Sequence, residues 1–244
     1  MRTLKGPPIR HSELLGQICQ FINAEVIVEI GVQHAKTFSE LVQAAKKIGG
    51  MVYGYDYLAP IGGYTGEHAA SAGDAKIIAS ALRGYEEYFK ITRVDTQSSE
   101  FPEILKNDVS SRHHNEEHIF PRIDFAFIDG DHSYRGCRKD FETIYPLLGD
   151  DGIIAFHDTH THIGLRKFVI DLYEDLNDGT FDIINLPFGH QEQRDGLTLL
   201  SKRSYPNTNK GITVSTHDPE MVDKDVYKLE NSWYDSELNK RKNL

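Results

Sequence analysis

The sequence predicts an α/β fold in which a mostly parallel sheet has helices on both faces. Apolar runs of strand length recur along the chain, and segments with apolar residues at helical spacing separate most of them. The two most apolar runs, 123–128 and 152–156, end abruptly in carboxylates and imidazoles. Strands buried on both faces of a parallel sheet are apolar throughout, and ligands bind at their carboxyl ends. We therefore expect the functional site at one edge of the sheet.

Seven apolar runs are predicted to be strands. They cover residues 24–31, 51–56, 89–95, 123–128, 152–156, 181–186 and 196–201. A turn is expected at 149–152, where the sequence reads Gly-Asp-Asp-Gly. The loop between the last two strands is too short for a crossover helix, so we expect these strands to pair antiparallel.

Helices are expected where apolar residues recur every three or four positions. These segments are 11–23, 37–48, 75–88, 100–106, 138–148 and 164–177. The helix at 138–148 joins the two most apolar strands, and such crossovers are right-handed. Those strands should therefore lie parallel and close together, with their carboxyl ends on the same edge.

The length of 244 residues suits one domain with appendages. We expect that domain to span 1–201, with an N-terminal helical arm and a covering loop at 59–75, followed by a polar C-terminal extension at 202–244. No apolar run is long enough to span a membrane, and the first residues lack the apolar stretch of a secretory signal. A cytoplasmic protein without a membrane partner is expected.

The charge distribution disfavours nucleic acid as a partner. The formal net charge is −10, with 37 acidic and 27 basic residues, and the basic residues are scattered along the chain. Binding a phosphate backbone requires a basic footprint. A small-molecule substrate fits better, and a homo-oligomer is left open. Cys19 and Cys137 are expected to be buried thiols in a reducing compartment.

The first two predicted strands end in residues that suit a nucleoside. Gly31 allows a sharp turn and the close approach of a ligand, and Asp56 can accept both hydroxyls of a ribose. The dinucleotide pattern requires three glycines, of which only the first is present. An adenosine-containing cofactor is therefore expected, and a nicotinamide dehydrogenase is disfavoured.

Several motifs together resemble the class I S-adenosylmethionine (SAM)-dependent methyltransferases. They are E-I-G-V at 29–32 followed by Thr37, Asp56, I-D-G-D-H-S-Y at 128–134, Asp140-Phe141, and G-I-I-A-F-H-D at 152–158. More narrowly, they resemble the macrocin-like group of sugar and antibiotic O-methyltransferases, many of which depend on magnesium. The resemblance covers roughly residues 12–201.

The resemblance implies a Rossmann-like fold with seven strands, of which only the last is antiparallel. It implies SAM as cofactor, bound by Glu29, Gly31, Thr37, Asp56, Asp95, Thr96 and Asp129. Asp129, His157 and Asp158 would bind a divalent metal, magnesium or manganese, and Asp131 would act as the base. His132 is a second candidate base, because an imidazole beside the acceptor can also take its proton. The acceptor would be a saccharide or another small polyhydroxylated compound.

This chain departs from the pattern at His157, where metal-dependent relatives often carry a second acid. Magnesium prefers oxygen ligands, so manganese, iron or no metal stay open. One alternative is a non-haem iron hydroxylase, because Asp129, His132, His157 and Asp158 include the ligand types of a facial triad. A catalytically silent nucleotide-binding scaffold is another. The histidines at 113–118 are expected to lie in a solvated loop.

Overall fold

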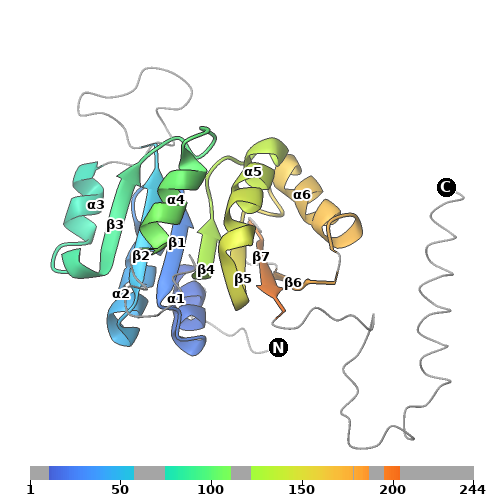
Figure 1. The fold of residues 1–244 in the computed structure, drawn as a ribbon. Helices are drawn as coiled ribbons and strands as arrows, with labels where there is room; N and C mark the ends of the chain where they lie inside the picture. The colour runs from blue at the N-terminus through green and yellow to red at the C-terminus, as the bar shows by residue number, and fades with distance from the viewer. Residues whose placement is uncertain (1–10, 58–74, 111–121, 178, 187–194, 204–244) are drawn as a thin grey trace, which may run out of the picture. The chain divides into compact units, whose positions relative to one another are not determined.

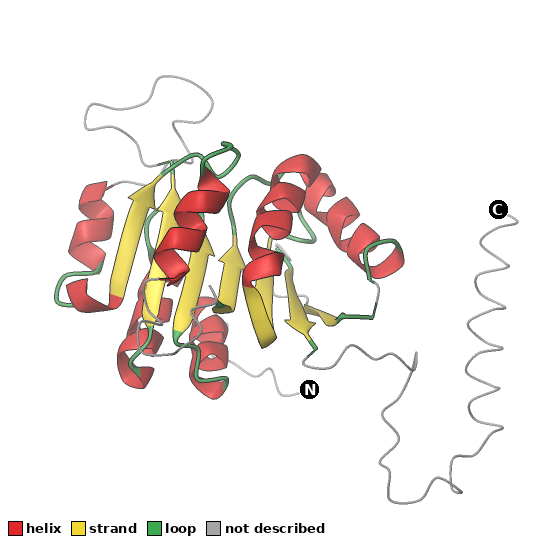
Figure 2. Cartoon of the chain, in the orientation of Figure 1, coloured by secondary structure: helices red, strands yellow, loops and turns green. Residues whose placement is uncertain are grey.

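The computed structural model describes residues 11–57, 75–110, 122–177, 179–186 and 195–203 (Figure 1). They form a seven-stranded sheet with the order β3-β2-β1-β4-β5-β7-β6 and helices around it (Figure 2). The strands are β1 (Val26–Ile30), β2 (Met51–Asp56), β3 (Phe89–Arg93), β4 (Ile123–Ile128), β5 (Leu148–His157), β6 (Phe181–Leu186) and β7 (Leu197–Lys202).

The helices that surround the sheet are α1 (His11–Phe21), α2 (Lys36–Ile48), α3 (Ala75–Ala81), α4 (Phe101–Ser110), α5 (Tyr134–Ile144) and α6 (Ile163–Glu174). Two short 3₁₀ turns lie within the described ranges, η2 (Glu86–Tyr88) and η3 (Tyr145–Leu147). None of the helices in the described ranges is long and apolar enough to cross a membrane.

The predicted seven-stranded sheet is confirmed. β1, β2, β3, β4 and β5 pair in parallel, whereas β7 runs antiparallel to both of its neighbours, β5 and β6. The antiparallel pairing of the last two strands follows from their short connection.

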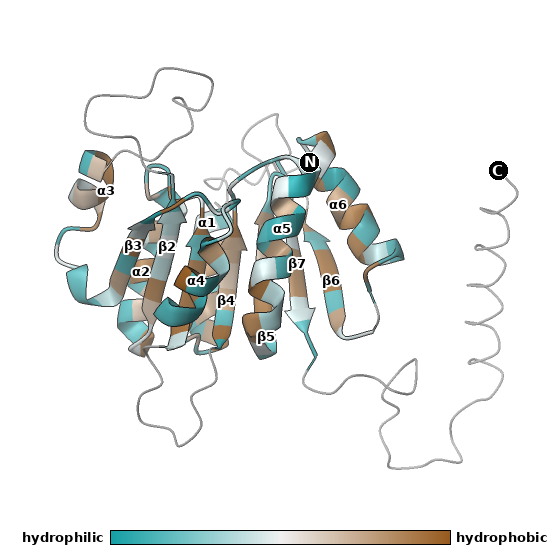
Figure 3. Cartoon of the chain, turned by 45° about the horizontal axis from the view of Figure 1, so that its top comes forward, coloured by the Kyte–Doolittle hydropathy of each residue, from teal (hydrophilic) through white to brown (hydrophobic). Residues whose placement is uncertain are grey.

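Each face of the sheet has its own hydrophobic core, because successive side chains of a strand point to opposite faces. On β4, Ala126 and Ile128 pack in the core beneath α4, α5 and α6, whereas Phe125 and Phe127 pack in the core beneath α1, α2 and α3. Figure 3 shows apolar residues concentrated along the central strands. Because apolar cores cover both faces of the sheet, polar side chains that could bind a ligand gather at the strand ends.

The turn predicted at 149–152 lies inside β5 as an irregularity. The β4–β5 pairing passes from Ile123–Leu148 directly to Phe125–Ile153, so the extra residues bulge out of the ladder. Asp151 has φ 62°, in the left-handed region that such a bulge uses. Pairing on both sides of the turn keeps it within the strand, and β5 therefore begins earlier than expected.

The helix boundaries shift from those predicted, and α5 and α3 show the reasons. α5 begins at Tyr134 instead of 138, because the Ser133 hydroxyl accepts a hydrogen bond from the Gly136 N–H at 3.0 Å and caps the helix. The segment predicted as one helix at 75–88 ends as a helix at Ala81, and Gly84 has φ 85° before the turn η2.

Three features expected from the sequence lie outside the described residues: the covering loop, apart from its last residue, the histidines at 113–118, and the C-terminal extension beyond residue 203.

Candidate active site

The register of the central strands brings four predicted site residues to one edge of the sheet. Ile30 of β1 pairs with Tyr55 of β2 and with Ile128 of β4, and Ile128 pairs with Phe156 of β5. The residues that follow these partners are Gly31, Asp56, Asp129 and His157. The strand order reverses between β1 and β4, and open α/β sheets bind ligands at such a switch point.

Gly31 makes the turn that opens this edge. Its φ is 89°, and a Cβ atom built on it would lie 2.1 Å from the Asp129 carbonyl oxygen. The Gly31 N–H donates to the Tyr55 carbonyl and the Asp129 N–H donates to the Ile30 carbonyl, both at 2.9 Å. Both the backbone conformation and the lack of space therefore require glycine here.

Buried carboxylates surround this glycine turn. Asp56 accepts the Gln33 N–H at 2.7 Å and is only 6% exposed. Glu29 is 2% exposed, and its Oε2 atom has no hydrogen-bond partner among the described residues. Burial raises the pKa of Glu29 well above its usual range, and the negative charges of Asp129 and Asp56 add to this effect. Glu29 therefore favours its neutral form here, and a positive charge bound at the turn would stabilise its carboxylate.

The segment after β3 joins the same region through Asp140 of α5. Gln97 donates from Nε2 to Asp140 Oδ1 at 3.0 Å, and the Thr96 hydroxyl also bonds to this carboxyl. Asp95 is exposed, and its Oδ1 accepts the Gln97 N–H at 2.8 Å. Asp95 therefore shapes the backbone, while Thr96 and Gln97 are held against α5.

A cluster of carboxylates and imidazoles follows β4 and β5. Asp129 Oδ1 lies 3.2 Å from His157 Nδ1 and 3.4 Å from His132 Nε2. Asp158 Oδ1 lies 3.4 Å from His157 Nδ1, and Asp158 Oδ2 lies 3.6 Å from His132 Nε2. The predicted metal ligands Asp129, His157 and Asp158 come together, and so does the predicted base His132.

The electrostatics of this cluster are those of mutually stabilising ion pairs. Burial alone would raise the pKa of Asp129, but hydrogen bonds with His132 and His157 lower it. The same bond to Asp129 raises the pKa of His132. Burial opposes protonation of His157, yet the hydrogen bond and negative charge of Asp129 raise its pKa.

His11, at the start of α1, packs against the cluster. Its ring lies 4.2 Å from that of His157, centroid to centroid, and its Nε2 lies 3.4 Å from the Thr37 hydroxyl. Burial and the neighbouring His157 lower the pKa of His11 to about 4. His11 is therefore neutral at pH 7 and links predicted residue Thr37 to the cluster. Sequence reasoning missed it, because α1 has no motif.

Asp131, the other predicted base, is not part of the cluster. Its side chain is exposed, and Oδ1 accepts the Ser133 N–H at 2.8 Å at the start of α5. A Cβ atom on Gly136 would lie 2.3 Å from Asp131 Oδ2, so the carboxylate sits against the first turn of the helix. Of the two predicted bases, only His132 faces the carboxylates Asp129 and Asp158.

His162 belongs to the cluster, and its side chain is 46% exposed. Its Nε2 lies 3.7 Å from Asp158 Oδ2, four residues earlier in the chain. Two groups of three side chains have ligand atoms within 4.8 Å of one another: Asp129, His157 and Asp158, and His132, Asp158 and His162. The alternating histidines in His-Asp-Thr-His-Thr-His were the available signal.

The sequence matches a known protein family over the strands that carry the site. A family model described as a methyltransferase domain matches residues 28–159, which is more than half of the chain. The matched segment runs from β1 to the end of β5 and contains the glycine turn, Asp56 and most of the cluster. No curated protein matches the sequence.

Solved structures share the fold at low sequence identity. The O-methyltransferase TomG from Streptomyces achromogenes, involved in tomaymycin synthesis and solved with SAM, is 14% identical; the match covers 79% of each chain with a TM-score of 0.57. An O-methyltransferase from Bacillus cereus, solved with SAH, is 16% identical; the match covers 82% of this chain and 84% of that chain, with a TM-score of 0.53. Cofactor-bound Rv0187 from MTB is 13% identical; the match covers 83% and 84%, with a TM-score of 0.56.

At this level of identity the neighbours show a shared fold, with TM-scores of 0.53 to 0.57. The chain belongs to the methyltransferase domain family and has the class I methyltransferase fold.

Proposed function

We propose that this protein transfers the methyl group of SAM to a hydroxyl oxygen of a small polyhydroxylated acceptor, as the macrocin-like O-methyltransferases do. The observation that carries the proposal is the register that brings Gly31, Asp56, Asp129 and His157 to one sheet edge. Methyl transfer requires donor and acceptor in line beside a group that receives the acceptor proton. One edge carries residues suited to each task.

The donor would bind over the Gly31 turn. SAM carries a positive sulfonium and a positive ammonium group, and the nearby carboxylates of Glu29, Asp56 and Asp129 favour such charges. The unpartnered Oε2 of Glu29 is an acceptor for the ammonium group. Asp56 accepts the Gln33 N–H, and a carboxylate has several lone-pair sites, which suits it to bind ribose hydroxyls. Thr96 and Gln97 would lie beside the adenine.

The acceptor would lie over the cluster after β4 and β5. A sugar hydroxyl is a weak acid, so its oxygen becomes a good nucleophile only when its proton is removed during the attack. His132 is 36% exposed in its side chain and is held by Asp129, so it can meet an acceptor from the solvent side. Its position suits a base better than that of Asp131.

The cluster also fits a divalent cation. Asp129, His157 and Asp158 offer two carboxylates and one imidazole within 4.8 Å of one another. A cation bound there would lower the pKa of a coordinated hydroxyl. The imidazole favours manganese or another transition metal over magnesium, which prefers oxygen ligands. With a cation bound, Asp129 would coordinate the cation and would no longer pair with protonated His132 and His157.

The O-methylation and the small acceptor rest on two kinds of support. The resemblance of I-D-G-D-H-S-Y to the macrocin-like group points to hydroxylated acceptors, and structural neighbours named as O-methyltransferases point to transfer to oxygen. The net charge of −10 disfavours a polyanionic acceptor such as nucleic acid.

Calorimetric titration of the full chain with SAM and SAH tests the donor site. The Asp56→Ala variant should bind both at least about tenfold more weakly, because two hydroxyl hydrogen bonds to a charged group are lost. Asp150→Ala is the matched control, since Asp150 is exposed on the β5 bulge at the opposite edge. Equal affinity in the two variants would contradict the donor assignment.

Transfer of labelled methyl groups to a panel of sugars, glycosides and catechols tests the acceptor class. We expect product with glycosidic or polyhydroxylated compounds and none with nucleic acid. SAM binding without turnover on any acceptor would instead support a silent nucleotide-binding scaffold.

A further inference from the structure

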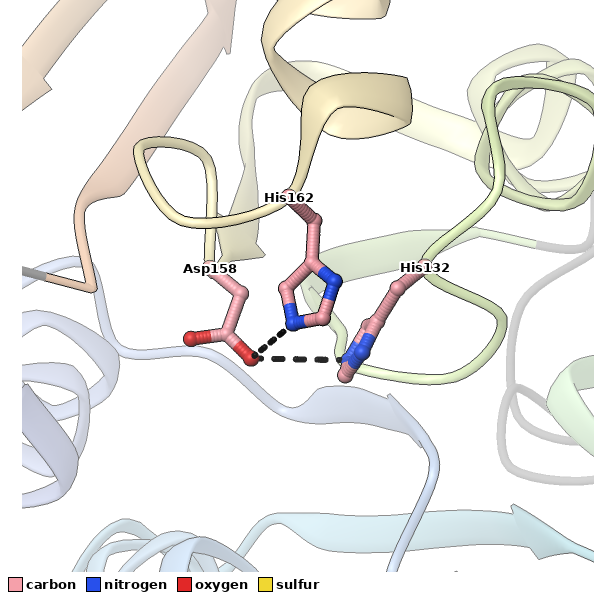
Figure 4. Close-up of side chains that lie close together, drawn as sticks. All are labelled: His132, Asp158 and His162. Atoms are coloured by element: carbon pink, nitrogen blue, oxygen red, sulfur yellow. Dashed lines mark ion pairs between the residues drawn. The ribbon is translucent and has the colours of Figure 1, made fainter.

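We propose that His132, Asp158 and His162 bind one divalent transition-metal ion, in a site separate from the Asp129, His157 and Asp158 set. The three residues come from two segments, the loop between β4 and α5 and the loop between β5 and α6 (Figure 4). The site would exist whether or not the protein methylates a hydroxyl, because it depends only on these side chains.

The distances fit a cation between the three side chains better than direct bonds among them. Asp158 Oδ2 lies 3.6 Å from His132 Nε2 and 3.7 Å from His162 Nε2, and both rings point toward it (Figure 4). A pair at 3.6 Å is too long for a hydrogen bond. In contrast, ligand atoms about 2.1 Å from a tetrahedral ion are roughly 3.4 Å from one another. Small side-chain movements would therefore bring the three ligand atoms to bonding distance from one ion.

The two oxygens of Asp158 face different partners. Oδ1 lies 3.4 Å from His157 Nδ1, whereas Oδ2 faces His132 and His162. A carboxylate can bind two cations through its two oxygens, as in sites where two metals lie about 4 Å apart. Sharing Asp158 thus does not merge the two ligand sets into one.

The backbone holds the three ligands in place. The N–H groups of Thr161 and His162 both donate to the Asp158 carbonyl at 3.2 Å, which closes a turn between the two ligands. Gly164 at the start of α6 packs on the other loop: a Cβ atom there would lie 2.8 Å from the His132 carbonyl oxygen and 2.5 Å from the Tyr134 nitrogen. Only a glycine allows α6 to bring His162 this close to His132.

The ligand types select the class of metal. Two imidazoles and one carboxylate suit zinc, manganese, iron or cobalt, whereas magnesium and calcium prefer oxygen ligands. Among the described residues, the ion pairs of Asp129 and Asp158 are all with histidines, so no lysine or arginine competes with a cation. His162 is 46% exposed in its side chain, which leaves a path for the ion and open positions for water or substrate.

The site changes the role of His132 when the ion is bound. An Nε2 atom that binds a metal cannot also take a proton from the acceptor. His132 then acts as a ligand, and an oxygen at an open position of the ion is activated by the metal charge.

Metal titration of the full chain tests the proposal. After removal of the purification tag and of bound metal with a chelator, zinc binding is measured by calorimetry and cobalt binding by visible absorption. We expect His162→Gln to weaken binding of one ion by at least about tenfold, the lower range for a disturbed metal shell. His160→Gln is the matched control, because His160 lies in the same loop but packs against Gly196.

Two further outcomes decide whether the site is separate. Asp129→Asn should leave the ion at His132 and His162 bound, whereas Asp158→Asn should weaken both sites. Equal zinc and cobalt binding in His162→Gln and His160→Gln would overturn the proposal. So would a single ion that Asp129→Asn and His162→Gln remove equally. Neither result bears on SAM binding, which the Asp56 experiment measures.

Discussion

Gly31 and Gly49 both have positive φ angles, 89° and 75°, yet their surroundings differ completely. A Cβ atom on Gly31 would lie 2.1 Å from a backbone oxygen, whereas one on Gly49 would meet nothing within 4 Å. Strain from the backbone conformation is therefore common to both positions, and the steric clash is confined to the glycine turn of the proposed donor site.

Alanine substitution separates these two effects. Gly49→Ala should lower the free energy of unfolding by about 1 kcal/mol, through strain at the helix end alone. Gly31→Ala should lower it by at least about 3 kcal/mol, because the Asp129 carbonyl must also move. Chemical denaturation of the two variants measures the difference. Equal losses in the free energy of unfolding would show that the backbone near Gly31 accommodates a Cβ atom at no extra cost.

Asp140 gives the protein a pH dependence that arises at a single side chain. It is fully buried, its Oδ2 has no hydrogen-bond partner among the described residues, and burial raises its pKa to about 7. Below pH 3.8 the carboxyl is neutral in both the folded and unfolded states. As pH rises from there to about 7, the unfolded chain loses the proton more readily, so folding becomes less favourable.

An Asp140→Asn variant lacks this ionisation. Its free energy of unfolding, relative to that of the wild type, should therefore rise between pH 5 and pH 8, by up to about 3 kcal/mol. Urea denaturation across this pH range measures the change. A constant difference would indicate that Asp140 keeps its charge at low cost.

At the scale of elements, Asp124 joins the starts of two central strands. Although it is on β4, its Oδ2 accepts the N–H groups of Glu25 and Val26, at 2.9 and 3.0 Å, and Oδ1 accepts from Arg122 at 2.8 Å. The β1–β4 register that aligns Gly31 with Asp129 is thus tied at its other end by one buried carboxylate.

Asp124→Ala should destabilise the fold by about 2 to 4 kcal/mol, because it leaves the buried N–H of Val26 and the partly buried N–H of Glu25 without their acceptor. Asp182→Ala is the control: Asp182 pairs with Arg203 on the exposed edge strand β6 and should cost less than about 1 kcal/mol. Thermal and chemical denaturation compare the two. Similar losses would mean that water replaces Asp124 at the strand start.

The elements themselves were largely predictable, and their ends were not. An apolar run determines that a strand forms, but pairing with its neighbour determines where it begins, as β5 and its bulge at 149–152 show. α5 likewise starts at Tyr134, because the Ser133 cap acts one turn before the apolar pattern becomes regular.

At the scale of the whole molecule, the sequence alone determined the fold class, the seven strands and the edge that carries the polar residues. Strand periodicity and the handedness of crossovers are general rules, so Asp129, His157 and Asp158, at the ends of two neighbouring parallel strands, could be assigned to one edge without coordinates. The motif resemblance added the methyltransferase family.

Only the tertiary structure decided which side chains meet. His162 joins the cluster because Gly164 lets α6 pack on the loop of His132, and His11 joins it because α1 packs beside α2. Asp131 turns to the start of α5, away from the cluster its neighbour His132 enters. Such contacts depend on close packing between segments distant in sequence, which no local pattern encodes.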